Sequence, residues 1–170
     1  MNLKILLIFV LLFSILNNRL NAQMSPAFKL SDTTVYQGQK HVLSGLVTNF
    51  RGNFQKESSE KLDSIIDFLK SNPEITLEIG VHTDQRGKSY PNYELSKRRA
   101  DALKNDICSK GGIDKNRIIA IGNGEDFPII SLDSILKFSK DDRESLYIKN
   151  RRIELQILEG KDYRTEFRQK

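Results

Sequence analysis

The sequence predicts an α/β (α+β) fold in the order β-α-β-α-β-(α)-β. Three observations predict it. Apolar residues recur with the period of a helix at 62–69, alternate with polar residues as in a strand at 75–79 and 153–157, and return to a helical spacing between 92 and 110. Helices interleaved with strands imply a sheet whose helices pack on one face.

The first residues have the pattern of a secretory signal. Lys4 precedes an apolar run from Ile5 to Leu16, and the small residue Ala22 follows a polar stretch. As a helix this run would span roughly 18 Å, whereas a bilayer core is about 30 Å thick. We therefore expect residues 1–22 to be a cleaved signal peptide that directs secretion across the inner membrane, with an uncleaved anchor as the alternative.

The segment after the signal is polar and rich in turn residues. Residues 23–41 are expected to form an N-terminal extension, either a linker or an added edge, with room for a short strand near Thr33 to Tyr36. Residues 42–50, VLSGLVTNF, predict the first strand, interrupted by Gly45.

The next two elements are predicted by their periodicity. Leu62, Ile65, Ile66 and Leu69 fall on one face of a helix, which Ser58 to Glu60 should start and Ser71 to Pro73 should stop. The following residues, 75–79, alternate between apolar and polar side chains and predict a half-buried strand that runs directly into His82.

A second helix should follow the loop 85–91. We expect Asn92 to be its N-cap and Gly111 and Gly112 to end it. Its inner face is predicted to consist of four residues: Leu95, Ala102, Leu103 and Ile107.

The remaining elements are shorter. Residues 117–121 predict a third strand, 132–138 a short helix followed by a loop, and 153–157 the last strand. Residues 159–170 form a basic tail that we expect to be a frayed end.

Charge and cysteine content exclude several classes of protein. The formal net charge of +5 over 170 residues is modest, and two of the cations, Lys4 and Arg19, lie in the signal. Neither this charge nor secretion favours a nucleic-acid partner. Cys108 is the only cysteine, so an intramolecular disulfide is impossible, and we expect it to be a small core residue on a helix.

The residues also argue against catalysis. His41 and His82 are the only histidines, and neither has a second metal ligand at the usual spacing. Ser89 and Ser96 lack the glycine pattern that surrounds a nucleophilic serine. We therefore expect no enzyme activity, no metal and no cofactor.

A spaced set of polar residues predicts a binding site instead. Asp84 lies at a strand end and can accept from an ammonium, whereas Arg99 lies on the next helix and can grip a carboxylate with two parallel hydrogen bonds. Together they suit a ligand that carries both groups on one carbon. The alternative is an exposed ion pair, which would contribute about 0–1 kcal/mol. Arg151 and Arg152 should point to opposite faces of the last strand.

These residues resemble a known family. The pattern is His82-Thr83-Asp84, Gly87, Asn92, Leu95-Ser96, Arg99-Ala100, Gly122, Gly124-Glu125, Pro128 and Asn150-Arg151-Arg152. In this order and spacing it is similar to the OmpA-like C-terminal domain, the peptidoglycan-associating module of outer-membrane porins, peptidoglycan-associated lipoproteins and flagellar stator proteins. The resemblance covers about residues 42–158 and implies a mixed sheet.

The resemblance also implies a function. It implies non-catalytic binding of peptidoglycan through the diaminopimelate of the stem peptide, in the periplasm of a Gram-negative-type bacterium and peripheral to the outer membrane. Asp84 would receive the diaminopimelate ammonium and Arg99 its carboxylate. His82, Thr83 and Asn92 would line the pocket, and Arg151 or Arg152 would supply a basic residue near its floor.

One alternative keeps the fold and changes the partner. The domain would then be an interaction subunit of an envelope complex that does not bind the wall. An envelope protein could dock on residues 23–40 in either case.

Overall fold

The computed structural model describes residues 27–32, 34–43 and 59–160. The expected signal peptide, residues 44–50 of the expected first strand and most of the basic tail therefore lie outside the described residues. Within the described part, no helix is both long enough and apolar enough to cross a membrane.

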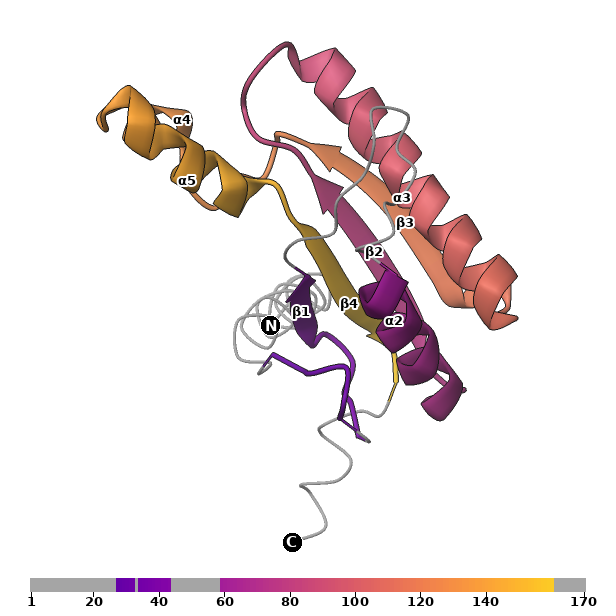
Figure 1. The fold of residues 1–170 in the computed structure, drawn as a ribbon. Coiled ribbons are helices and arrows are strands. Elements are labelled where there is room, and N and C mark those ends of the chain that lie inside the picture. Colours follow the sequence, from indigo (N-terminus) through magenta and orange to yellow (C-terminus); the bar gives the residue numbers. More distant parts are fainter. Residues whose placement is uncertain (1–26, 33, 44–58, 161–170) are drawn as a thin grey trace, which may run out of the picture.

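One mixed sheet of four strands organises the fold (Figure 1). In chain order its strands are β1 (Lys40–Leu43), β2 (Thr76–His82), β3 (Ile118–Gly124) and β4 (Ile153–Glu159). Their order across the sheet is β1-β4-β2-β3. β4 pairs antiparallel with β1 and β2, whereas β2 and β3 run parallel. The predicted mixed sheet is confirmed.

Two long helices, α2 (Ser59–Ser71) and α3 (Ser89–Gly111), lie on one side of the sheet (Figure 1). Between β3 and β4 the chain forms α4 (Leu132–Leu136) and α5 (Lys140–Asn150), which lie beyond the end of the sheet where β4 begins. The loop expected at 139–147 is thus wrong, because Ser139 starts a helix by accepting a hydrogen bond from the Asp142 amide.

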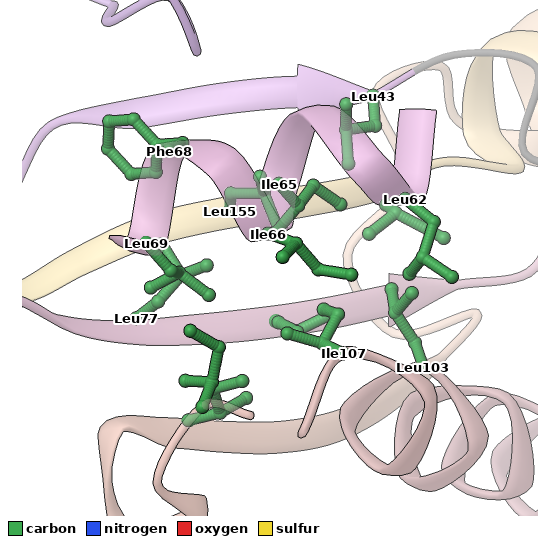
Figure 2. Packing of buried hydrophobic residues seen from close by; sticks show 14 of the residues in the cluster. Leu43, Leu62, Ile65, Ile66, Phe68, Leu69, Leu77, Leu103, Ile107 and Leu155 are labelled. Atoms are coloured by element: carbon green, nitrogen blue, oxygen red, sulfur yellow. The ribbon is translucent and has the colours of Figure 1, made fainter. Parts of the chain in front are cut away.

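The core lies between the sheet and the two long helices (Figure 2). The predicted face of α2 is buried, and Phe68 joins it. Facing side chains come from β2, β4 and α3, among them Leu77, Leu155 and Ile107. Cys108 is buried on α3, as predicted.

Part of the segment expected to be a linker belongs to this core. Phe28 is 1% exposed, and its ring stacks on Phe68 with 5.2 Å between the ring centroids. Val35 is also buried. The amide of Gly38 donates to the carbonyl of Ile157, so the pairing with β4 starts before β1.

The end of α2 is fixed by a side chain from elsewhere in the chain. Arg117, in the short 3₁₀ helix η2 (Lys115–Arg117), donates to three backbone carbonyls in and after the last turn of α2. They belong to Leu69, Asn72 and Ile75, at 2.6–3.1 Å. Arg117 therefore satisfies acceptors that a helix C-terminus leaves free.

The packing of α3 on β3 depends on glycine. A Cβ at Gly122 would lie 2.2 Å from the Lys97 nitrogen, so the helix and strand backbones touch there. The amide of Gly124 donates to the Ser96 hydroxyl, which is fully buried. Small residues, Ser96 and Ala100, therefore occupy the centre of the inner face of α3, and the predicted Leu95 and Ala102 are only half-buried.

Candidate functional site

The loop between β2 and α3 carries the candidate site, and Asp84 is its centre. Its side chain is 8% exposed. One carboxylate oxygen accepts from the backbone N–H and the Nε of Arg86, and the other accepts from Arg86 Nη2 and Arg151 Nη1. A carboxylate offers about four lone-pair sites, so the arginines occupy the full acceptor capacity of Asp84.

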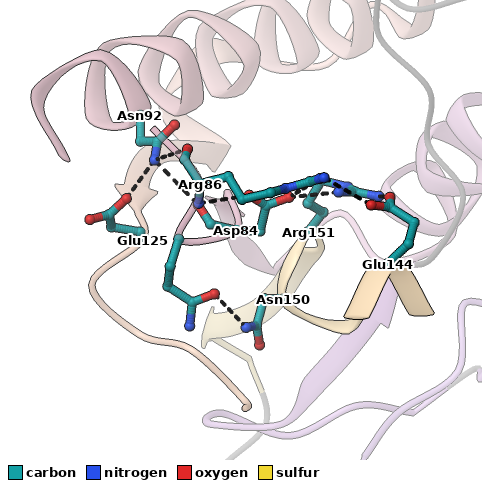
Figure 3. Close-up of polar contacts among 8 residues, drawn as sticks. Asp84, Arg86, Asn92, Glu125, Glu144, Asn150 and Arg151 are labelled. Carbon is teal, nitrogen blue, oxygen red and sulfur yellow. Dashed lines mark hydrogen bonds and ion pairs between the residues drawn. The ribbon is translucent and has the colours of Figure 1, made fainter. Parts of the chain in front are cut away.

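A second carboxylate holds the same two guanidinium groups from the solvent side (Figure 3). Glu144, on α5, accepts from Arg86 Nη1 at 2.8 Å and from Arg151 Nη2 at 2.6 Å. Its side chain is 53% exposed. Arg86 is further positioned by Tyr147, since its Cζ lies 4.6 Å from the centre of that ring.

These contacts stabilise the charged form of each group, which lowers the pKa of the carboxylic acids and raises that of Arg86. Burial alone would raise the pKa of Asp84, but hydrogen bonds from Arg86 and Arg151 outweigh it and lower that pKa. The hydrogen bond from Arg151 likewise lowers the pKa of Glu144. The hydrogen bond to Asp84 raises the pKa of Arg86. All four groups are therefore charged at neutral pH.

Arg99 is the third guanidinium of the site and differs from the other two. Its Nε is buried and has no hydrogen-bond partner among the described residues. Burial lowers the pKa of Arg99, and the charges of Arg151 and Arg98 lower it further, whereas Asp84 opposes the change. The charges of Asp84 and Arg151 thus affect Arg99, but Arg99 forms no ion pair with Asp84.

Asn92 holds the site loop in place. The predicted capping role is wrong, because α3 begins three residues earlier, at Ser89, and Asn92 lies in its first turn. Its amide nitrogen donates to the carbonyls of Asp84 and Arg86 and to the carboxylate of Glu125. The side chain therefore ties both ends of the turn 84–86 to the helix.

Thr83 is buried beside Asp84. Its amide donates to the Gly124 carbonyl at 2.8 Å, which continues the pairing of β2 with β3. Its hydroxyl oxygen has no hydrogen-bond partner in the described part of the chain. The Thr83 hydroxyl, the Nε of Arg99 and the Nδ1 of His82 are thus three buried polar atoms of the predicted site that have no hydrogen-bond partner among the described residues.

His82 and Arg152 are placed elsewhere. Both line an open groove of ≈ 690 Å³ together with Glu78, Gly80 and Gln156, on the sheet face opposite the core. Arg152 donates to Glu154 and to the carbonyls of Asn150 and Phe127. Both arginines precede β4, so they do not occupy opposite faces of that strand as predicted. Their side chains nevertheless have different partners, and of the two Arg151 is the one that binds Asp84.

The environment of His82 keeps it neutral. The residue is 5% exposed, and its Nε2 lies 3.2 Å from the amide nitrogen of Asn123. Burial, with a smaller contribution from Arg152, lowers the pKa of His82 to about 4, although Glu154 opposes the change. This histidine is therefore uncharged at neutral pH.

The sequence analysis did not predict Arg86 and Glu144 as site residues, nor the contacts that hold the site loop against its neighbours. Arg86 had a local signal, since it follows Asp84 by two residues in the same loop. Glu144 had none, because 60 residues separate it from Asp84. The buried amide of Asn150 links the site loop to the α4 side by donating to Gln85 and to the Ile130 carbonyl.

The arrangement can bind a charged ligand. Arg86 and Arg151 pair with Asp84 and Glu144, and the charge in excess is that of Arg99, which makes no ion pair among the described residues. The nearby carboxylate of Glu125 accepts from Asn92 and makes no ion pair with these three arginines in the described part of the chain. In the described residues, no group of three or more His, Cys, Asp or Glu side chains is placed to hold a metal ion. The excess charge suits a ligand that brings a carboxylate.

A family model described as the OmpA family matches residues 51–141. The chain belongs to the OmpA family. Its sequence is 31% identical over 103 residues to a peptidoglycan-associated lipoprotein of Pasteurella multocida, covering 61% of this chain and 62% of the lipoprotein. It is 29% identical over 79 residues to outer membrane porin F of Pseudomonas aeruginosa, covering 46% of this chain and 23% of the porin.

Solved structures show the same OmpA-like fold. The peptidoglycan-associated lipoprotein of Burkholderia pseudomallei matches 66% of this chain and 86% of its own, with a TM-score of 0.53 and 24% identity. The periplasmic domain of Helicobacter pylori MotB matches 80% of this chain and 85% of its own, with a TM-score of 0.56 and 18% identity. Because the chain spans only about a fifth of the porins, membership in the OmpA family identifies a domain they share.

Proposed function

We propose that this protein binds peptidoglycan in the periplasm, without catalysis, through the diaminopimelate of the stem peptide. Membership in the OmpA family and the names of two relatives, peptidoglycan-associated lipoproteins, support the general function. The observation that carries the finer proposal is Arg99, a half-buried cation whose Nε has no hydrogen-bond partner in the described chain, beside a site with one unbalanced positive charge.

The ligand carboxylate would pair with Arg99. A charge-assisted hydrogen bond contributes about 1.5–3 kcal/mol before discounting for solvent, so one such contact gives modest affinity. Many identical sites along the wall would then supply retention through rebinding.

The ligand ammonium would reach Asp84 by exchange. Since all acceptor sites of Asp84 are occupied, one guanidinium nitrogen must leave when the ammonium arrives. Arg86 is the better candidate, because its side chain is 48% exposed whereas that of Arg151 is 32% exposed. The released guanidinium can stay on Glu144 or take the ligand carboxylate, so no charge is left without a partner.

Sedimentation with purified sacculi tests the proposal. Arg99→Gln should bind at least about tenfold more weakly, which corresponds to one lost charge-assisted contact. Arg98→Gln is the matched control, because it removes the same charge from the adjacent, exposed position of α3. Equal loss in both variants would show that net charge, and not the Arg99 site, governs sedimentation.

Chemical variation of the ligand gives an independent test. Amidation of the free diaminopimelate carboxylate removes the anionic partner of Arg99. Stem peptides with the amide should bind Arg99→Gln and the unmodified protein about equally in titration calorimetry. Equal affinity of the unmodified protein for amidated and free peptides would overturn the role of Arg99.

A second candidate function is supported by exposed apolar residues between β3 and the end of α5. Five of them are between 48% and 63% exposed: Phe127, Ile129, Leu136, Phe138 and Ile148. Apolar surface of this kind suits a protein partner in the envelope. Co-purification of an envelope protein that is lost on Phe138→Ser, without retention on sacculi, would favour this function.

A further inference from the structure

Glu144 holds the place on the guanidinium pair that an incoming anion would take. Asp84 binds Arg86 and Arg151 from the buried side, and Glu144 binds the same two groups from the exposed side. A carboxylate approaching from solvent therefore meets cations that already have an anionic partner. Of the three arginines of the site, Arg99 is the one that makes no ion pair in the described residues.

The position of Glu144 is set by a well-supported helix. Arg151 is the C-cap of α5, directly after the last helical residue, and its guanidinium donates to Glu144 in the middle of the same helix at 2.6 Å. At its start, α5 is tied to α4 because Arg143 donates to the carbonyls of Leu136 and Phe138. These contacts hold the Glu144 carboxylate in a defined position next to Arg86 and Arg151.

We infer that Glu144 determines specificity, by making the site discriminate a zwitterion from a plain anion. This inference rests on the proposed function of the Asp84 and Arg99 site. A plain dicarboxylate can pair with Arg99, but Glu144 and Asp84 repel it. A zwitterion offers an ammonium to these carboxylates, so their charge helps it to bind. Glu144 therefore penalises one class of ligand and not the other.

The sign of the effect follows from the charges. With Glu144 present, three cations face two anions, whereas Glu144→Gln leaves three cations facing Asp84 alone. The variant should bind any carboxylate better, because Arg86 and Arg151 each regain a free donor. The gain in affinity should be larger for a ligand without ammonium groups. Such a ligand is only repelled by Glu144, whereas a zwitterion also loses the attraction between Glu144 and its ammonium.

Two probes of equal length separate these effects. The seven-carbon diacid pimelate lacks both ammonium groups of meso-diaminopimelate and keeps both carboxylates. Each probe would be titrated into the full mature chain while the amide resonances of the Asp84 loop and α3 are followed by NMR, which measures millimolar affinities. The ratio of the two dissociation constants is the specificity of the site.

We expect the unmodified protein to prefer meso-diaminopimelate. In Glu144→Gln this preference should fall about tenfold, mainly through tighter pimelate binding, as expected when one carboxylate on two guanidinium groups is removed. Asp141→Asn is the control, because it removes one charge from an exposed position of the same helix. It should leave the ratio unchanged.

The remaining outcomes separate the inference from the function on which it rests. If Glu144→Gln folds and keeps the full preference, Glu144 only orders the arginines, and the inference is overturned while the wall-binding proposal stands. A ratio that falls equally in Asp141→Asn would also overturn it. If the unmodified protein binds neither probe and does not sediment with sacculi, both proposals fail together.

Discussion

Gly122 faces the backbone of Lys97 with no room for a side chain between them. A Cβ there would lie 2.2 Å from the Lys97 nitrogen and 2.5 Å from its Cα. The obstacle is the backbone of a 23-residue helix, which cannot turn aside as a side chain can. This contact fixes the distance of α3 from the sheet, and with it the position of Arg99.

Gly122→Ala should therefore destabilise the protein by about 3 kcal/mol or more, as for an overpacked core. The matched control is Gly112→Ala, where φ is 65° and nothing lies near the added Cβ. It should cost about 1 kcal/mol, because only the left-handed backbone is strained. Urea denaturation measures both, and equal losses would show that α3 can shift without cost.

The stability of the protein should fall on mild acidification because of His82. The pKa of His82 is lowered to about 4 in the folded state, against 6.5 in the unfolded chain. The unfolded state therefore binds more protons between these values. The resulting stabilisation is complete above pH 6.5 and is lost as the pH falls toward 4. Between pH 7 and 5 the loss should be about 2 kcal/mol.

His82→Gln tests this assignment, since glutamine does not titrate. Thermal or urea unfolding should show a nearly flat stability between pH 7 and 5 in the variant, whatever its absolute stability. The lowered pKa values of Asp84 and Glu144 act in a lower range, below their ordinary values of 3.8 and 4.5. An unchanged slope in the variant would mean that another group titrates in this window.

Removal of the buried charge at Asp84 should destabilise the protein in a salt-dependent way. Asp84→Asn leaves three guanidinium groups facing Glu144 alone and turns an amide N–H₂ toward two of them. We expect a loss of about 2 kcal/mol at low ionic strength, and a smaller loss at about 0.5 M salt, where repulsion is screened. Urea titrations at both salt concentrations measure it.

The control for Asp84→Asn is Asp126→Asn, an exposed site on the loop after β3. It should change stability by less than about 0.5 kcal/mol at either salt concentration. A salt-independent loss at Asp84 would indicate that lost hydrogen bonds, and not charge repulsion, dominate.

Arg117 should stabilise the junction between α2 and β2. Arg117→Met keeps much of the side-chain bulk and removes the donors to three backbone carbonyls. The expected loss is about 2 kcal/mol. Lys115→Met, at an exposed position of the same 3₁₀ helix, should have little effect. Hydrogen exchange should quicken in the last turn of α2 in the first variant only.

Periodicity predicted the parts of this fold in which large apolar residues do the packing. The face of α2 was predicted well because leucine and isoleucine mark it at helical spacing. The face of α3 was predicted only in its second half, where Leu103 and Ile107 are buried. The rest of this face consists of Ser96 and Ala100, and the close approach of the helix there depends on Gly122 from a distant strand. A hydrophobic pattern within α3 carries no information about that strand.

In the site, too, local patterns predicted some features, whereas others depend on distant parts of the chain. Strand alternation predicted that Arg151 and Arg152 would separate, and their side chains do have different partners, but both residues lie between α5 and β4 and not in the strand. His82 was grouped with Asp84 because both belong to the segment that resembles the family, but the chain leaves β2 between them, and His82 remains on the open face. Glu144 reaches the site through the packing of α5, which no local pattern encodes.

The directions of the strands have a mechanical consequence. β1 and β2 point the same way, because each is antiparallel to β4. Lys40 lies level with Glu78 through their shared partner Gln156, so the chain enters β1 at the end of the sheet far from the loop that follows His82. A pull between that entry and that loop would run along the strands. It would load the hydrogen bonds of β1, β4 and β2 together in shear, instead of opening them one after another as a zipper does.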